Sequence, residues 1–150
     1  MFIEKLRAKG TVTLELRDKD GNLKTTITKN LIVDTGLVFI ASRMKDAAAG
    51  VMTHIGIGSS NVAAAPADIA LGTELARVAL DSTSIATTNV PNDSIQYVAT
   101  FGAGIGTGAV VEAGIFDAPA GGNMLARTVF GVVTKTATDV FTVTWKIAIS

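Results

Sequence analysis

The sequence contains no cysteine and only three prolines, and charged residues make up 17% of it. Without cysteine, the chain forms no disulfide and offers no thiolate ligand to a metal. It has no run of about 18 apolar residues, so no membrane-spanning helix is expected. Residues 1–6 mix charged with apolar side chains and lack the apolar centre of a signal peptide. These absences predict a protein that is made in the cytoplasm and has no membrane partner.

The low charge content lies below the usual value of about 25% and is typical of a surface that contacts other proteins. An excess of Ala and Gly can give the same composition. The net charge is zero but uneven, because residues 1–46 carry nine Lys/Arg against six Asp/Glu and residues 47–150 carry four against seven. This asymmetry can attract opposite ends of neighbouring subunits, but it is too weak for a nucleic-acid-binding surface.

An N-terminal hairpin is expected within residues 1–29. Residues 10–17 alternate apolar and polar side chains, which is the pattern of a half-buried strand. Residues 18–22, Asp-Lys-Asp-Gly-Asn, are typical of a tight turn, and residues 23–28 form the returning strand. The hairpin is either a solvated edge of the fold or an arm that contacts a neighbouring subunit.

One short helix is expected at about residues 35–46. Asp34 or Thr35 can cap its first turn. The apolar residues that follow recur at the spacing of a helix with one buried face. They are Leu37, Val38, Ile40, Ala41 and Met44.

Beyond residue 52, short strands alternate with loops rich in Gly, Pro and Asn. Several short strands at roughly ten-residue spacing indicate a β-sandwich. We therefore predict a mostly-β, single-domain protein in which residues 30–150 form a β-sandwich-like core and residues 1–29 the hairpin. The expected strands cover residues 54–58, 75–82, 94–101, 109–116, 124–130 and 140–149.

Two loops resemble ligand sites superficially. Residues 18–22 begin like a calcium loop, but Leu23 and Lys29 occupy the positions that require Gly and a carboxylate. The glycine-rich residues 102–108 fit neither the dinucleotide nor the P-loop spacing, and strands are expected on both sides. We favour a hairpin turn for residues 18–22, and for residues 102–108 either a flexible connection or a place where another backbone packs closely.

The candidate catalytic residues are His54, Glu74 and Glu112. His54 is the only histidine, and no nucleophile motif or metal-ligand spacing accompanies it. Glu74 precedes Arg77 by three residues, and Arg127 lies on a strand that can pair near Glu112. Carboxylates within apolar strands are usually satisfied by such arginines or by backbone N–H groups. We therefore predict no catalytic, cofactor-binding or metal-ligating residue, and a protein that is not an enzyme.

A carbohydrate-binding module is the alternative function. Tyr97 and Trp145 are the candidate aromatic platforms, although Trp145 lies in an alternating strand where burial is equally expected. The module would require the loops around Asn61, Asn89 and Asn123 to form one exposed end.

A resemblance to a known family covers roughly residues 30–130. Residues 30–36 (Asn-Leu-Ile-Val-Asp-Thr-Gly) precede the helix, and residues 54–59 (His-Ile-Gly-Ile-Gly-Ser) follow it. Next come residues 71–77 (Leu-Gly-Thr-Glu-Leu-Ala-Arg), residues 111–117 (Val-Glu-Ala-Gly-Ile-Phe-Asp) and residues 124–127 (Met-Leu-Ala-Arg). This order resembles that of the phage tail-collar fibre domain and of small virion proteins of tailed bacteriophages.

The resemblance implies a non-enzymatic structural component of a tailed-bacteriophage virion, assembled in the host bacterial cytoplasm and without a cofactor. The chain would attach through repeated protein–protein contacts, as a tail or baseplate fibre-adaptor subunit or as a capsid decoration (cement) subunit. Its expected partners are tail, baseplate or major capsid proteins and further copies of itself, with a trimer favoured. Neither nucleic acid nor a membrane is an expected partner.

Overall fold

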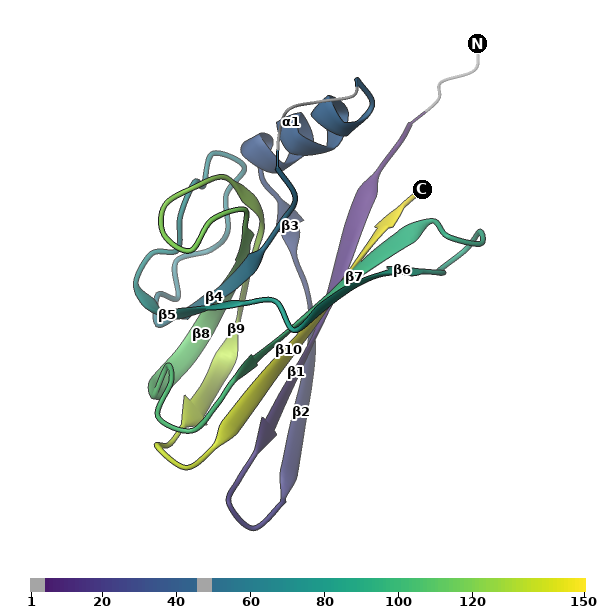
Figure 1. The fold of residues 1–150 in the computed structure, drawn as a ribbon. Helices are drawn as coiled ribbons and strands as arrows, with labels where there is room; N and C mark the ends of the chain where they lie inside the picture. The colour runs from purple at the N-terminus through teal and green to yellow at the C-terminus, as the bar shows by residue number, and fades with distance from the viewer. Residues whose placement is uncertain (1–4, 46–49) are drawn as a thin grey trace.

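The computed structural model describes residues 5–45 and 50–150. Two five-stranded antiparallel sheets pack as a sandwich, with one short helix at one end (Figure 1), which confirms the predicted fold class. Sheet A has the strand order β2-β1-β10-β7-β6, and sheet B has the order β3-β9-β8-β4-β5. The elements are β1 Ala8–Arg17, β2 Leu23–Lys29, β3 Leu31–Ile32, α1 Asp34–Arg43, β4 His54–Gly58, β5 Glu74–Ala79, β6 Ser82–Ala86, β7 Ser94–Phe101, β8 Gly108–Phe116, β9 Met124–Lys135 and β10 Val140–Ile149.

The core lies between the inner faces of the two sheets. In β10, alternate residues from Phe141 to Ile147 are buried, as the apolar–polar alternation predicts. Phe101 packs against Phe141, and both are fully buried with Trp145. Sheet B contributes Ile55, Ile57, Ala113 and Ile115 from its inner face.

The N-terminal hairpin is confirmed. The carboxylate of Asp18 accepts hydrogen bonds from the backbone N–H groups of Asp20 and Asn22, and Gly21 adopts a φ of 84°, which favours glycine. Residues 18–22 therefore form a turn. β1 pairs with β10 along its whole length, from Ala8↔Ile149 to Arg17↔Val140, so this strand lies inside sheet A, and β2 forms the edge.

Helix α1 begins and packs differently from the prediction. Its N-cap residue is Val33, and no side chain caps the first turn, because the Thr35 hydroxyl donates instead to the Met124 carbonyl on β9. The expected buried face is wrong, since Leu37, Val38 and Met44 are exposed. The helix instead lies against β9 through buried Gly36, and Phe39 and Ile40 pack on the core. It ends at Arg43, and the predicted limit of Asp46 lies outside the described residues.

One predicted strand is in fact two. The predicted strand at residues 75–82 covers most of β5, which belongs to sheet B, and only the first residue of β6, which belongs to sheet A. Leu80 donates a backbone hydrogen bond to Thr53 before β4, whereas Asp81 donates to Val98 on β7. The chain therefore crosses between the sheets at these two residues. β9 is also longer than predicted and continues to Lys135.

Candidate functional site

Glu112 is fully buried and fully hydrogen-bonded. Its carboxylate accepts hydrogen bonds from the backbone N–H groups of Ser60 (3.1 Å), Gly72 (2.9 Å) and Thr73 (2.8 Å). Arg127 donates to the same carboxylate through Nε (3.1 Å) and Nη2 (2.9 Å). Burial acts to raise the pKa of Glu112, but these hydrogen bonds outweigh it and hold the pKa below its ordinary value. The group is therefore an ionised structural anchor at neutral pH.

Arg127 extends this anchor into the loop between β4 and β5. Its guanidinium donates to Asp68 (3.0 Å) and to the Val62 carbonyl (3.0 Å). Since the Glu112–Arg127 pair contacts residues 60, 62, 68, 72 and 73, it ties the whole loop to the outer face of sheet B. The pairing expected between Glu112 and Arg127 is present.

Glu74 and Arg77 form a second anchor. Two parallel hydrogen bonds of 2.8 Å join the Arg77 guanidinium to the Glu74 carboxylate. The same guanidinium donates to the carbonyls of Ala118 and Gly121 and lies 3.5 Å from the centre of the Phe116 ring. Arg77 thus holds the loop between β8 and β9 against sheet B.

Glycines in β4 and β8 make room for these side chains. A Cβ atom at Gly58 would overlap the Thr73 carbonyl and the Glu112 carboxylate, and one at Gly56 would press on Leu71 and Phe116. Four of the motifs that carry the family resemblance, at residues 54–59, 71–77, 111–117 and 124–127, therefore meet around Glu112. Both glutamates lie opposite Gly58 in the register, on either side of β4, and each is engaged by its own arginine.

The other candidate residues lie apart from these anchors. His54 begins β4, is partly buried, and has its Nδ1 2.7 Å from the Thr53 hydroxyl. Residues 102–108 form a connection from sheet A to sheet B, and a side chain at Gly106 would collide with Ile57. Over residues 5–45 and 50–150, no three His, Cys, Asp or Glu side chains gather as metal ligands, and no helix has the length and apolar character to cross a bilayer.

The features expected of a carbohydrate site do not assemble. Trp145 is fully buried and Tyr97 is 7% exposed, so neither offers a stacking platform. The loop that carries Asn89 projects from the end of sheet A, away from the two sheet B loops that carry Asn61 and Asn123 (Figure 1).

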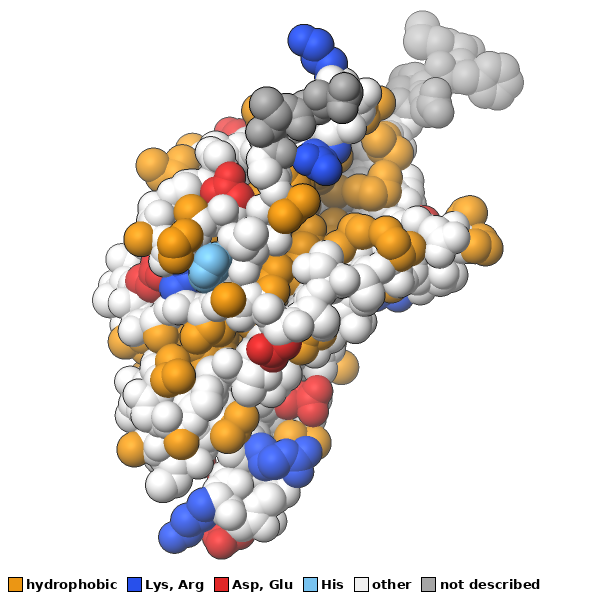
Figure 2. Space-filling model, in the orientation of Figure 1, with side chains coloured by type: hydrophobic (Ala, Val, Ile, Leu, Met, Phe, Trp, Pro, Cys, Tyr) orange, Lys and Arg blue, Asp and Glu red, His pale blue; other side chains and the backbone are white. Residues whose placement is uncertain are grey.

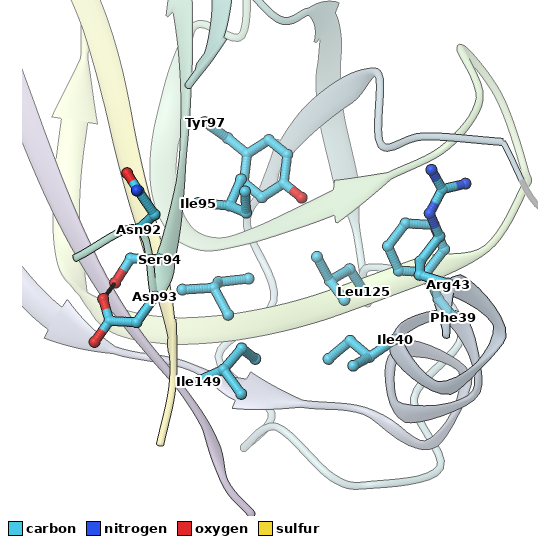
Figure 3. A pocket seen from close by; sticks show the side chains of 11 residues that line it. Phe39, Ile40, Arg43, Asn92, Asp93, Ser94, Ile95, Tyr97, Leu125 and Ile149 are labelled. Atoms are coloured by element: carbon cyan, nitrogen blue, oxygen red, sulfur yellow. Dashed lines mark hydrogen bonds between the residues drawn. The ribbon is translucent and has the colours of Figure 1, made fainter. Parts of the chain in front are cut away.

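An apolar groove lies at the end of the sandwich where α1 sits over the inner face of sheet A. Phe39 and Ile40 from the helix face Ile95, Tyr97 and Ile149 across a cavity of about 240 Å³ (Figure 3). A second cavity of about 450 Å³ shares Phe39, Ile95 and Tyr97 with it and continues to Val51 and Thr83. Because α1 covers this face only partly, apolar side chains gather along the recess (Figure 2). Sequence periodicity gave no signal for the groove.

Charged and polar groups lie at the rim of this groove. Burial raises the pKa of Tyr97. Arg43, the last residue of α1, lies near enough that its positive charge opposes this increase. On the opposite rim, Asp93 accepts hydrogen bonds from the backbone N–H groups of Thr88, Asn89 and Val90. These bonds shape the loop between β6 and β7, so this carboxylate has a structural role.

Comparison with protein-family models, curated proteins and solved structures found no match to this chain. The resemblance to the phage tail-collar fibre domain is therefore still a prediction from the motifs.

Proposed function

We propose that this chain is a non-enzymatic structural subunit of a tailed-bacteriophage particle, attached to other virion proteins and to further copies of itself. It is assembled in the host bacterial cytoplasm. It acts as a tail or baseplate fibre adaptor or as a capsid decoration subunit.

The observation that carries this proposal is the apolar surface around the groove end of the sandwich. Isolated proteins rarely expose large contiguous apolar patches, and such patches commonly mark protein contacts. Several large apolar side chains at this end are more than half exposed. They are Leu6, Leu37, Val38, Met44, Val51, Ile85 and Val90.

The engagement of the two glutamates supports a structural rather than a catalytic role. A general acid at neutral pH needs a raised pKa, whereas the pKa of Glu112 is lowered. Glu74 is held by two hydrogen bonds from Arg77. Both carboxylates therefore serve to attach loops to sheet B.

Purified particles of the phage or prophage that encodes the chain would test this proposal. We expect the protein to co-purify with intact particles and to be visible by antibody labelling in electron microscopy. Hundreds of copies per particle would indicate the capsid surface, and a few to a few dozen would indicate the tail. Absence from purified particles would contradict the proposal, and specific binding on a host-glycan array would favour the carbohydrate-binding alternative.

A further inference from the structure

The two sheets have four edge strands, and these differ in how well they are protected against pairing with another chain. Exposed edges pair readily with other chains unless they are very short, carry charges or are interrupted by a bulge. β2 carries Lys24 and Lys29, and β3 has two residues. β5 contains Glu74 and Arg77 and meets β4 with a register shift.

β6 has none of these protections. Its sequence, Ser-Thr-Ser-Ile-Ala, contains neither a charge nor a proline, and it pairs with β7 without a register shift. Four of its five residues are exposed, including Ile85 at 61%. Its other side faces no strand among the described residues.

We propose that β6 pairs antiparallel with β6 of a second copy of this chain, which joins two sheets A into one ten-stranded sheet. This inference deepens the self-association part of the proposed function and does not depend on where in a particle the protein lies.

The register of this pair follows from the strand itself. Residues directly opposite each other in an antiparallel ladder lie on the same face, so the apolar faces of both copies stay on one side. All five residues overlap in one register, which places Ser84 opposite Ser84 of the second copy. Thr83 then lies opposite Ile85 of the second copy on the inner face, where Ile85 already neighbours Ile95.

The charges around β6 suit this register. It brings Asp81 opposite Thr87 of the second copy, whose carbonyl accepts a hydrogen bond from Lys146 (2.6 Å). The Asp81 carboxylate accepts a hydrogen bond from Thr100, which lies on the same outer face as Lys146. Asp81 of one copy and Lys146 of the other therefore lie near the same end of the paired strands. Residues 78–126 contain no Lys or Arg, so no like-charge pair of cations arises along the two strands.

A two-fold contact produces even-numbered assemblies. The trimer expected from the family resemblance would then occur as a pair of trimers joined through β6.

Two single-cysteine variants provide the first test, because the chain has no cysteine of its own. Opposed residues of an antiparallel ladder have Cα atoms about 4.5–5.5 Å apart, which suits a disulfide. The Ser84→Cys variant should form an intermolecular disulfide rapidly under mild oxidation. The control, Thr25→Cys on β2, is exposed on the opposite edge of the same sheet and should not. Equal and slow cross-linking of both variants would overturn the proposal.

Charge substitution at Ser84 provides the second test, with sedimentation velocity as the readout over a concentration series. Wild-type protein should dimerise, and Ser84→Lys should raise the dissociation constant at least about fivefold because two lysines face each other. An equimolar mixture of Ser84→Lys and Ser84→Glu should recover the dimer, and Thr25→Lys should leave it unchanged. Circular dichroism would verify that each variant folds. A wild-type protein that stays monomeric at every concentration, or a dimer insensitive to Ser84→Lys, would overturn the proposal without bearing on the particle location.

Discussion

The outer face of sheet B and the groove end of sheet A use their side chains in opposite ways. On the outer face of sheet B, the charged side chains lie beneath two loops, which Glu112, Arg127 and Arg77 attach to the sheet. At the groove end, apolar side chains such as Val38 and Ile85 are exposed to solvent. The glutamates and arginines that the sequence offered as site candidates thus hold loops in place, whereas the groove end exposes apolar side chains with Arg43 and Asp93 at the rim.

The largest effect is expected from removal of the Arg127 guanidinium. Arg127→Met leaves Glu112 buried without its charged partner and should lower the free energy of unfolding by about 3–5 kcal/mol. Urea denaturation followed by tryptophan fluorescence measures this change. In the control, Arg17→Met removes an exposed guanidinium that donates to the Gly21 carbonyl, and it should cost less than about 0.5 kcal/mol. Equal effects for both variants would show that sheet B is not organised around the buried pair.

A smaller loss is expected from Gly58→Ala. The added Cβ overlaps the Thr73 backbone carbonyl, which cannot move without displacing the loop, so a cost of about 1–3 kcal/mol follows. Gly131→Ala is the matched control, because a Cβ there meets nothing within 4 Å. Unchanged stability of Gly58→Ala in the same denaturation assay would contradict the close packing of this loop.

Part of the dependence of stability on pH should be traceable to Glu112, beside the hydrogen-bonded carboxyl groups of Asp18 and Asp93, whose pKa values are also lowered. A carboxyl group whose pKa is lowered by folding stabilises the protein above its ordinary pKa, and the effect is lost as the pH falls through the folded value. The free energy of unfolding should therefore decrease from about pH 5 downward. In Glu112→Gln this decrease should be shallower, because the substituted group does not titrate. Parallel pH profiles for the two proteins would rule out this contribution.

The smallest effect on stability is expected at the groove end. Leu37→Ser and Val38→Ser change exposed side chains and should alter the free energy of unfolding by less than about 0.5 kcal/mol. Under the proposed function, the double variant should nevertheless reduce incorporation into particles, measured by quantitative immunoblotting of purified virions. Normal incorporation would show that these residues do not belong to the contact surface.

The fold was largely predictable because apolar–polar alternation marks several of its strands. β7 and β10 have the bounds expected from the sequence, and the turn at residues 18–22 follows from its composition. The division between β5 and β6 was missed because Leu80 and Asp81 cross between the sheets without glycine or proline. The predicted buried face of α1 was wrong. The spacing of its apolar residues is compatible with burial, but the sandwich leaves Leu37 and Val38 uncovered.

The anchors were predictable only in part. The two Glu–Arg pairs follow from their spacing in the sequence and from the pairing of neighbouring strands. The backbone N–H groups of Ser60, Gly72 and Thr73 carry no sequence signal, so the role of Glu112 in holding a loop emerged from the structure. The groove and the unprotected β6 edge depend on how the sheets and α1 are arranged, which periodicity does not describe.

Hydrogen exchange tests the contrast between the two regions most directly. Amide exchange would be compared by mass spectrometry between the isolated chain at low concentration and the same chain in its assembled form. We predict slower exchange in α1 and β6 on assembly, with no change in the loop between β4 and β5, which Glu112 and Arg127 already hold in the single chain. Slower exchange in that loop, with α1 and β6 unchanged, would contradict the account.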